Sequence, residues 1–101
     1  MHLITRKRLN DAAKLHPNAK AKLAHWHRAA KAAVWSSLID TKKTFGSADQ
    51  CKVASGRTVT IFNVSNDYRL ITAIHYNRKK VYILRFLTHA EYDKDRWKAE
   101  L

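Results

Sequence analysis

The chain has 101 residues, of which 46% are hydrophobic, so we expect one domain spanning residues 1–101 around one modest core. Twenty Lys and Arg residues against eight Asp and Glu give a formal net charge of +12, which favours a nucleic acid or an acidic protein as partner. No run approaches the roughly 20 apolar residues of a membrane span, and the single Cys51 cannot form an internal disulfide. These features predict a cytoplasmic protein without a membrane segment.

The first 35 residues predict two helices. Residues 2–5 are compatible with a short strand, after which Thr5 is placed to cap a helix that runs to about His16, where Pro17 forces a break. Asn18 can cap a longer helix that runs to about Trp35. Small and apolar residues recur along this second helix at steps of four and three, which predicts a face toward the core. They are Ala19, Leu23, Trp26, Ala30 and Ala33.

The opposite face of this second helix is basic. It carries Lys20, His27, Arg28 and Lys31. A charged face opposite an apolar one is usually a solvated surface. The alternative is a contact surface for phosphate groups or for a macromolecular partner.

Beyond residue 50 the pattern changes from helices to strands. Residues 38–44 are compatible with a short helix, and residues 45–47 with a loop. Four segments rich in β-branched and aromatic residues then follow, at 51–53, 58–64, 68–76 and 80–88. Residues that favour tight turns lie between these four segments, at 55–56, 66–67 and 77–78. We therefore predict an antiparallel meander.

Together these elements predict an α+β fold. Two N-terminal helices pack on one face of a mostly antiparallel sheet of four or five strands, and a short helical turn follows the last strand. The other face of the sheet is then partly open. Alternation along the strands places Arg69 with Ile71 on one side, and on one side of the last strand it places Val81, Ile83, Arg85 and Leu87.

Arg69 and Arg85 lie within otherwise apolar strands. A guanidinium there is costly unless it meets a carboxylate, a phosphate or solvent. We therefore hypothesise that both arginines hold a phosphate by forked hydrogen bonds. The alternative for each is a structural salt bridge or an exposed position on the sheet.

His89 and Tyr92 are candidate proton-transfer groups. They are three residues apart, on the same side of the expected helical turn, and both side chains can act as acid or base. To act as a base, Tyr92 would need its pKa lowered by positive neighbours such as Lys94 and the arginines. The alternatives are a cap or surface role for His89 and a packing role for Tyr92, while Asp93 is expected to balance a nearby cation or to face solvent.

The sequence offers three candidate substrate contacts and no motif for a metal site. Asn63, Asn66 and Lys94 are candidate substrate contacts, with turn and strand-end hydrogen bonding as the alternative for the two asparagines. The sequence lacks an HExxH, a CxxC pair and an acidic cluster, so we expect no metal and no cofactor. Metal-independent cleavage of RNA is therefore the enzyme hypothesis.

Two segments carry a family resemblance. They are Asn66-Asp67-Tyr68-Arg69-Leu70 and Thr88-His89-Ala90-Glu91-Tyr92-Asp93-Lys94, and residues 1–7, 33–35 and 62–64 agree with them. Through these segments the chain resembles the HigB-type toxins of bacterial type II toxin-antitoxin modules, which belong to the RelE/ParE-like superfamily. The resemblance covers nearly the whole chain.

This resemblance implies an activity and a partner. The expected activity is ribosome-dependent cleavage of mRNA at the A site by attack of a 2′-hydroxyl, restrained by a HigA-like antitoxin with a helix-turn-helix domain. The matching site residues are Arg69, Arg85, His89, Tyr92 and Lys94, with the arginines stabilising charge and His89 or Tyr92 moving protons. Two alternatives stay open, a ParE-like toxin that binds gyrase and a non-catalytic basic module that binds RNA or ribosomes. The proton-transfer pair favours the nuclease, because a gyrase binder does not need one.

Overall fold

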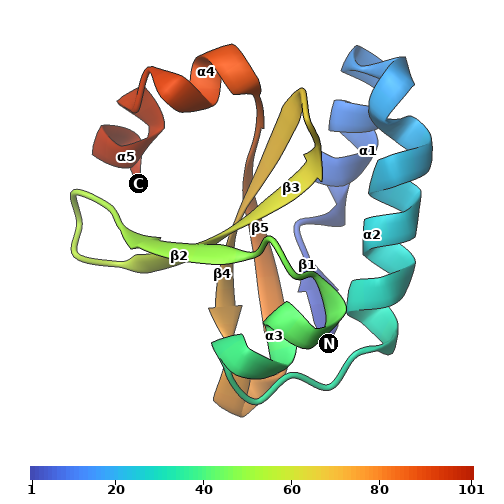
Figure 1. The fold of residues 1–101 in the computed structure, drawn as a ribbon, viewed down its shortest axis with the longest axis vertical. Coiled ribbons are helices and arrows are strands. Elements are labelled where there is room, and N and C mark those ends of the chain that lie inside the picture. The colour runs from blue at the N-terminus through green and yellow to red at the C-terminus, as the bar shows by residue number, and fades with distance from the viewer.

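A five-stranded sheet organises the computed structural model, which describes residues 1–101, and helices lie on both of its faces (Figure 1). The strands are β1 (His2–Ile4), β2 (Asp49–Lys52), β3 (Thr58–Ser65), β4 (Tyr68–His75) and β5 (Lys80–Thr88). The helices are α1 (Arg6–Leu15), α2 (Lys20–Ala32), α3 (Leu38–Thr44), α4 (His89–Asp93) and α5 (Arg96–Glu100). The spatial order of the strands is β1-β5-β4-β3-β2, with β1 parallel to β5 and the other pairs antiparallel. The predicted α+β class and the meander are confirmed. None of the five helices combines the length and the apolar character that crossing a membrane requires.

The two N-terminal helices form, but the second ends at Ala32 and not near Trp35, because Ala33 is extended, and neither is capped as expected. Thr5 has a left-handed backbone, and its hydroxyl accepts a hydrogen bond from the Ile83 backbone at 3.0 Å instead of capping α1. Pro17 starts a short 3-10 turn that delays α2 to Lys20, and the Asn18 side chain accepts from the Tyr68 hydroxyl at 2.8 Å. These polar side chains therefore join the helical layer to the sheet rather than ending helices.

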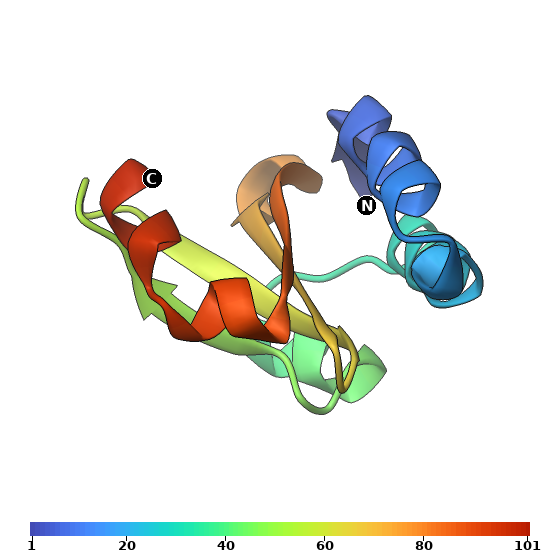
Figure 2. The ribbon, with the colours of Figure 1, turned by 90° about the horizontal axis from the view of Figure 1, so that it is seen from above.

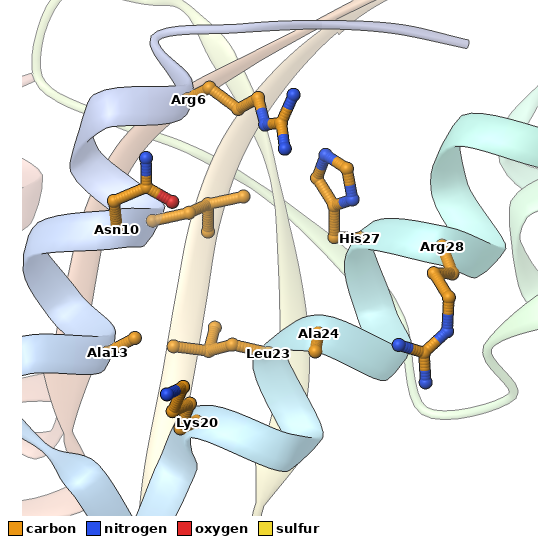
Figure 3. Close-up of a pocket in the computed structure, with 9 residues that line it drawn as sticks. Arg6, Asn10, Ala13, Lys20, Leu23, Ala24, His27 and Arg28 are labelled. Atoms are coloured by element: carbon orange, nitrogen blue, oxygen red, sulfur yellow. The ribbon is translucent and has the colours of Figure 1, made fainter.

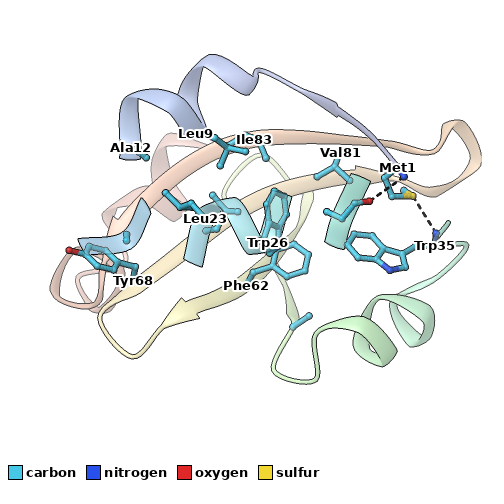
Figure 4. Close-up of a cluster of buried hydrophobic side chains, with 14 residues drawn as sticks. Met1, Leu9, Ala12, Leu23, Trp26, Trp35, Phe62, Tyr68, Val81 and Ile83 are labelled. Atoms are coloured by element: carbon cyan, nitrogen blue, oxygen red, sulfur yellow. Dashed lines mark hydrogen bonds between the residues drawn. The ribbon is translucent and has the colours of Figure 1, made fainter. Parts of the chain in front are cut away.

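The main core lies between the sheet and the layer of α1 and α2 (Figure 4). Phe62 of β3 is at its centre, with ring centroids 5.3 Å from Trp26, 6.0 Å from Trp35 and 5.3 Å from Phe45. The predicted stripe of α2 faces this core. Aromatic pairs at these separations add to the stability that burial of their surface provides. The cluster fixes α2 and the loop after it against β3.

A second, smaller core lies on the other face of the sheet, under the C-terminal helices. Trp97 of α5 is only 3% exposed and packs there with Val53, Val59, Ile61, Ile71 and Leu87. Figure 2 shows α4 and α5 on the opposite side of the sheet from α1 and α2. The face expected to be partly open is therefore covered over part of its area, by a helix that the sequence did not predict.

A β-bulge in β5 changes which residues share a face. Ile71 pairs with Arg85 and Thr72 pairs with Ile83, so Leu84 has no partner on β4. Val81 and Ile83 consequently face the main core, whereas Leu87 faces the second core. The expectation that Val81, Ile83, Arg85 and Leu87 share one side is wrong, because the extra residue reverses the alternation.

Replacing the central aromatic ring should test the main core. We expect Phe62→Ala to lower the free energy of unfolding by about 3–5 kcal/mol, because it removes a buried ring and leaves a cavity among three others. Urea unfolding followed by tryptophan fluorescence measures the change. As a control, Ile39→Ala on α3, where the side chain is 71% exposed, should change stability by about 0.5 kcal/mol or less. Equal losses in the two variants would contradict this assignment of the core.

Candidate active site

The end of β5 and the start of α4 are fixed against the turn between β3 and β4. Thr88 accepts a hydrogen bond from the Glu91 backbone at 3.2 Å, and the Glu91 carboxylate accepts one from the Thr88 backbone at 3.0 Å. This capping box starts α4 at His89. The His89 backbone in turn donates to the Asp67 carbonyl at 2.7 Å. The strand that carries Arg69 and the helix that carries His89 and Tyr92 are thereby held side by side.

Arg69 and Tyr92 are in direct contact. The Arg69 guanidinium carbon lies 5.8 Å from the centroid of the Tyr92 ring, a cation-π arrangement. Its Nη1 donates to the carbonyl oxygens of Ser65 at 2.9 Å, Tyr68 at 3.0 Å and Asn66 at 3.4 Å. All three bonds come from one nitrogen, so the remaining donors of the guanidinium stay available to an anion.

Tyr92 is half-buried and lies between the positive charges of Arg69 and Lys98 and the apolar residues of the second core. Its ring stacks on Trp97, with centroids 5.5 Å apart and planes 17° from parallel. Burial raises the pKa of the Tyr92 phenol above its ordinary value and outweighs the positive charges of Lys98 and Arg69, which lower it. The downward shift that a tyrosine base would require does not occur. At neutral pH Tyr92 is therefore a neutral phenol that can donate a proton or a hydrogen bond.

His89 is paired with a carboxylate on the same helix. Its Nδ1 lies 2.9 Å from Asp93 Oδ2, and the imidazole is 51% exposed. Asp93 is itself 59% exposed, so its carboxylate contacts both the imidazole and solvent. A proton on Nδ1 that is held by a carboxylate leaves Nε2 as the nitrogen that accepts a proton. A half-exposed imidazole held in this way through Nδ1 is suited to act as a general base through Nε2.

Arg85 shares the sheet face with Arg69 but has its own acidic neighbour. Arg69 pairs with Leu87 and Arg85 pairs with Ile71, so the two arginines are diagonal neighbours on β4 and β5. Arg85 Nη2 lies 3.9 Å from Glu100 of α5, and Nη1 donates to the Leu84 carbonyl at 2.8 Å. Glu100 is 61% exposed, so this ion pair is weak and a bound phosphate can displace the carboxylate.

The three predicted substrate contacts lie around this group rather than within it. Lys94 is exposed and borders a hollow of about 220 Å³ that Trp97 and Glu100 also line. Asn63 pairs with Arg69 across the strands and borders a separate hollow against α2. Asn66 is in the turn, where its carbonyl accepts from Arg69. The assignment of Asn63, Asn66 and Lys94 as substrate contacts stays a prediction.

Lys98 is a member of the site that sequence reasoning missed. Its ammonium lies 5.6 Å from the centroid of the Trp97 ring and 3.3 Å from Asp95 Oδ1. The hydrogen bond that Lys98 donates to Asp95 raises the pKa of Lys98, so this charge is firmly positive. The apolar pair Trp97 and Leu101, four residues apart, was the available signal for a helix that brings Lys98 to Tyr92.

The grouped side chains suit acid-base chemistry on an anion. An imidazole oriented by a carboxylate can accept a proton, and a neutral phenol can supply one. Arg69, Arg85 and Lys98 provide positive charge around them. A phosphodiester, which requires one proton removed, one supplied and its developing negative charge stabilised, is the substrate type that matches this set.

Comparisons with known proteins agree with this chemistry. Residues 19–95 match the model of the family HigB_toxin, described as the RelE-like toxic component of a toxin-antitoxin system. The mRNA interferase toxin HigB of Escherichia coli (strain K12) is 34% identical over 94 residues, which cover 92% of this chain and 88% of the relative. The mRNA interferase HigB of Shigella flexneri has the same identity and coverage. The mRNA interferase HigB of Escherichia coli O6:H1 is 27% identical over 94 residues, which cover 93% of this chain and 90% of the relative.

The state of Tyr92 can be measured directly. In a spectrophotometric titration of phenolate absorbance, the component lost in Tyr92→Phe should titrate above the ordinary tyrosine value of about 10, because burial disfavours the charged form. Lys98→Gln should raise this pKa further, since it removes a neighbouring positive charge. A Tyr92 component that titrates below about 10 would show that the charges outweigh burial.

Proposed function

Because this chain belongs to the HigB family of RelE-like toxins of toxin-antitoxin systems, we propose that it is an endoribonuclease that cleaves messenger RNA. The family membership confirms the resemblance seen in the sequence. Relatives that share 34% identity with this chain are named mRNA interferases, and they align with nearly the whole chain. The observation that carries the proposal is the pairing of a neutral phenol against Arg69 with an oriented imidazole on the same short helix.

We infer that cleavage proceeds by attack of a ribose 2′-hydroxyl on the adjacent phosphorus. His89 Nε2 takes the proton of the 2′-hydroxyl while Asp93 holds the imidazole through Nδ1. The new bond between the 2′-oxygen and phosphorus forms as the bond to the 5′-oxygen breaks, and Tyr92 gives its proton to that leaving oxygen. The products are a 2′,3′-cyclic phosphate and a 5′-hydroxyl, so all atoms and protons are accounted for.

Arg69 and Arg85 have complementary roles in this mechanism. The carbonyl oxygens of the β3–β4 turn and the Tyr92 ring hold Arg69 in place, so its orientation is set before the substrate binds. Arg85 approaches the phosphate after the exposed Glu100 is displaced. Both guanidinium groups then stabilise the additional negative charge that develops on the phosphate oxygens.

The finer assignments follow the family and the charge of the chain. The formal net charge of +12 supports docking on an RNA surface, and we propose that cleavage takes place on translated messages at the ribosomal A site, in the cytoplasm. As a toxin of a toxin-antitoxin system, the chain has an antitoxin as partner. We propose a HigA-like antitoxin with a helix-turn-helix domain.

Induced expression followed by mapping of 5′ ends on cellular mRNA tests the activity. We expect new ends within translated frames for the parent, and a cleavage rate roughly 10²–10⁴-fold lower for His89→Ala, because the general base is removed. His25→Ala is the matched control, since this exposed histidine is on α2, across the sheet. Undiminished cleavage in His89→Ala would remove His89 from the mechanism, and an absence of new ends in the parent would refute the activity.

A pair of variants separates the two roles of Arg85. Arg85→Ala should lower the cleavage rate roughly 10²–10³-fold, because one donor to the developing charge is lost. Glu100→Gln removes the ion pair but keeps the guanidinium, so it should cleave as well as the parent. Single-turnover rates on a model mRNA in ribosome complexes measure both. Similar losses in the two variants would mean that Arg85 acts only through its ion pair.

A further inference from the structure

A groove runs between α1 and α2, on the face of the protein away from the candidate active site. It has a volume of about 230 Å³ and an aliphatic floor formed by Leu9, Ala13, Leu23 and Ala24. Arg6 of α1 and His27 of α2 point toward each other across it, and Lys20 and Arg28 complete the rim (Figure 3). The groove therefore combines an apolar base with a basic border.

The positive charge around the groove is not neutralised within the protein. Its lining contains no carboxylate, and Arg6, Lys20 and Arg28 take part in none of the four ion pairs of the structure. A second hollow of about 290 Å³ shares Arg6 and His27 and adds His2 and Lys31, so the basic border continues toward β1. Burial, and after it Arg6, Lys31 and Arg28, lower the pKa of His27. The groove is thus poised to accept negative charge.

The floor of the groove distinguishes a peptide from a nucleic acid. Proteins that hold single-stranded RNA stack its bases on aromatic rings, and the only ring in this groove is the His27 imidazole. Aliphatic floors accept aliphatic side chains instead. A segment with leucine-like side chains on one side and glutamate or aspartate on the other complements both the floor and the rim.

We propose that this groove binds an acidic, partly aliphatic segment of the antitoxin. This inference rests on the proposed function only in naming the partner. α1 and α2 lie across the sheet from α4 and α5 (Figure 2), so a segment bound here does not cover His89 or Tyr92. The groove would hold the antitoxin on the toxin, and any obstruction of the active site would come from another part of the antitoxin.

Calorimetry with the purified full-length chain and its cognate antitoxin tests the docking. In a His89→Ala background, which avoids toxicity during expression, Arg6→Glu/Arg28→Glu should weaken binding roughly tenfold or more, because attraction becomes repulsion. Lys7→Glu/Lys42→Glu is the matched control. It makes the same change in net charge at exposed lysines outside the groove and should bind within about twofold of the parent. Thermal unfolding of each variant checks that the fold is retained.

A second measurement uses the parent groove, so it does not depend on how the variants fold. In NMR titrations, the pKa of His27 should be higher in the complex than in the free protein, because a nearby carboxylate favours the charged imidazole. Equal losses of affinity in both double variants, or an unchanged His27 pKa, would overturn the proposal.

RNA cleavage separates this inference from the proposed function. With His89 intact, Arg6→Glu/Arg28→Glu should cleave as the parent does, since the groove is remote from the site. Loss of cleavage with unchanged antitoxin affinity would assign the groove to RNA and refute the docking proposal alone. A parent that binds the antitoxin through the groove but cleaves no mRNA would refute the proposed function and leave the docking proposal standing.

Discussion

Burial of Trp97 is the interaction on which the candidate site depends. The five residues of α5 are too few to form a stable helix in isolation, so α5 exists because its tryptophan fills the second core. Trp97 also donates from its indole nitrogen to the Tyr92 carbonyl at 3.1 Å and stacks on the Tyr92 ring. Through this residue, the packing of one sheet face sets the position of the phenol, of Lys98 and of the Glu100 carboxylate beside Arg85.

The positive groups on the two faces of the sheet have different surroundings. On the face of α4 and α5, positive groups surround a phenol that burial keeps neutral, which suits proton transfer beside an anion. On the face of α1 and α2, positive groups border an aliphatic floor, which suits attachment of an acidic chain. The local apolar surroundings, and not the net charge alone, therefore decide which kind of anionic partner each face suits.

Hydrophobic periodicity was enough to predict most of the fold. The bounds of β5, the stripe of α2 and the helical turn at His89 were confirmed, because each rests on a local pattern that the core enforces. α5 was missed because its five residues carry too little periodicity to predict a helix, and its N-cap Asp95 has a left-handed backbone and makes no side-chain cap.

The candidate site was predictable where contacts are local and not where they depend on tertiary structure. The spacing of His89 and Asp93 on one helix can be read from the sequence, whereas the register that places both arginines on one sheet face cannot, because it depends on the bulge in β5. The contact of Arg85 with Glu100 depends on α5, and the upward pKa shift of Tyr92 depends on the second core. The bulge at Leu84 could not be predicted from the sequence, because apolar residues continue through it and both faces of β5 pack against a core.

That bulge makes Leu84 differ from the other positions of β5 in what a deletion would do. Leu84 is the one position of the strand without a partner on β4, and it changes the phase between the half that packs under α1 and the half that carries Arg85. Exchanging Leu84 for another apolar residue preserves that phase. Deleting Leu84 would leave Ile83 and Arg85 consecutive and on opposite faces, as they are now, whereas a deletion within either half would turn part of the strand over. Over evolutionary time β5 should therefore accept a change of length at Leu84 and almost none within either half.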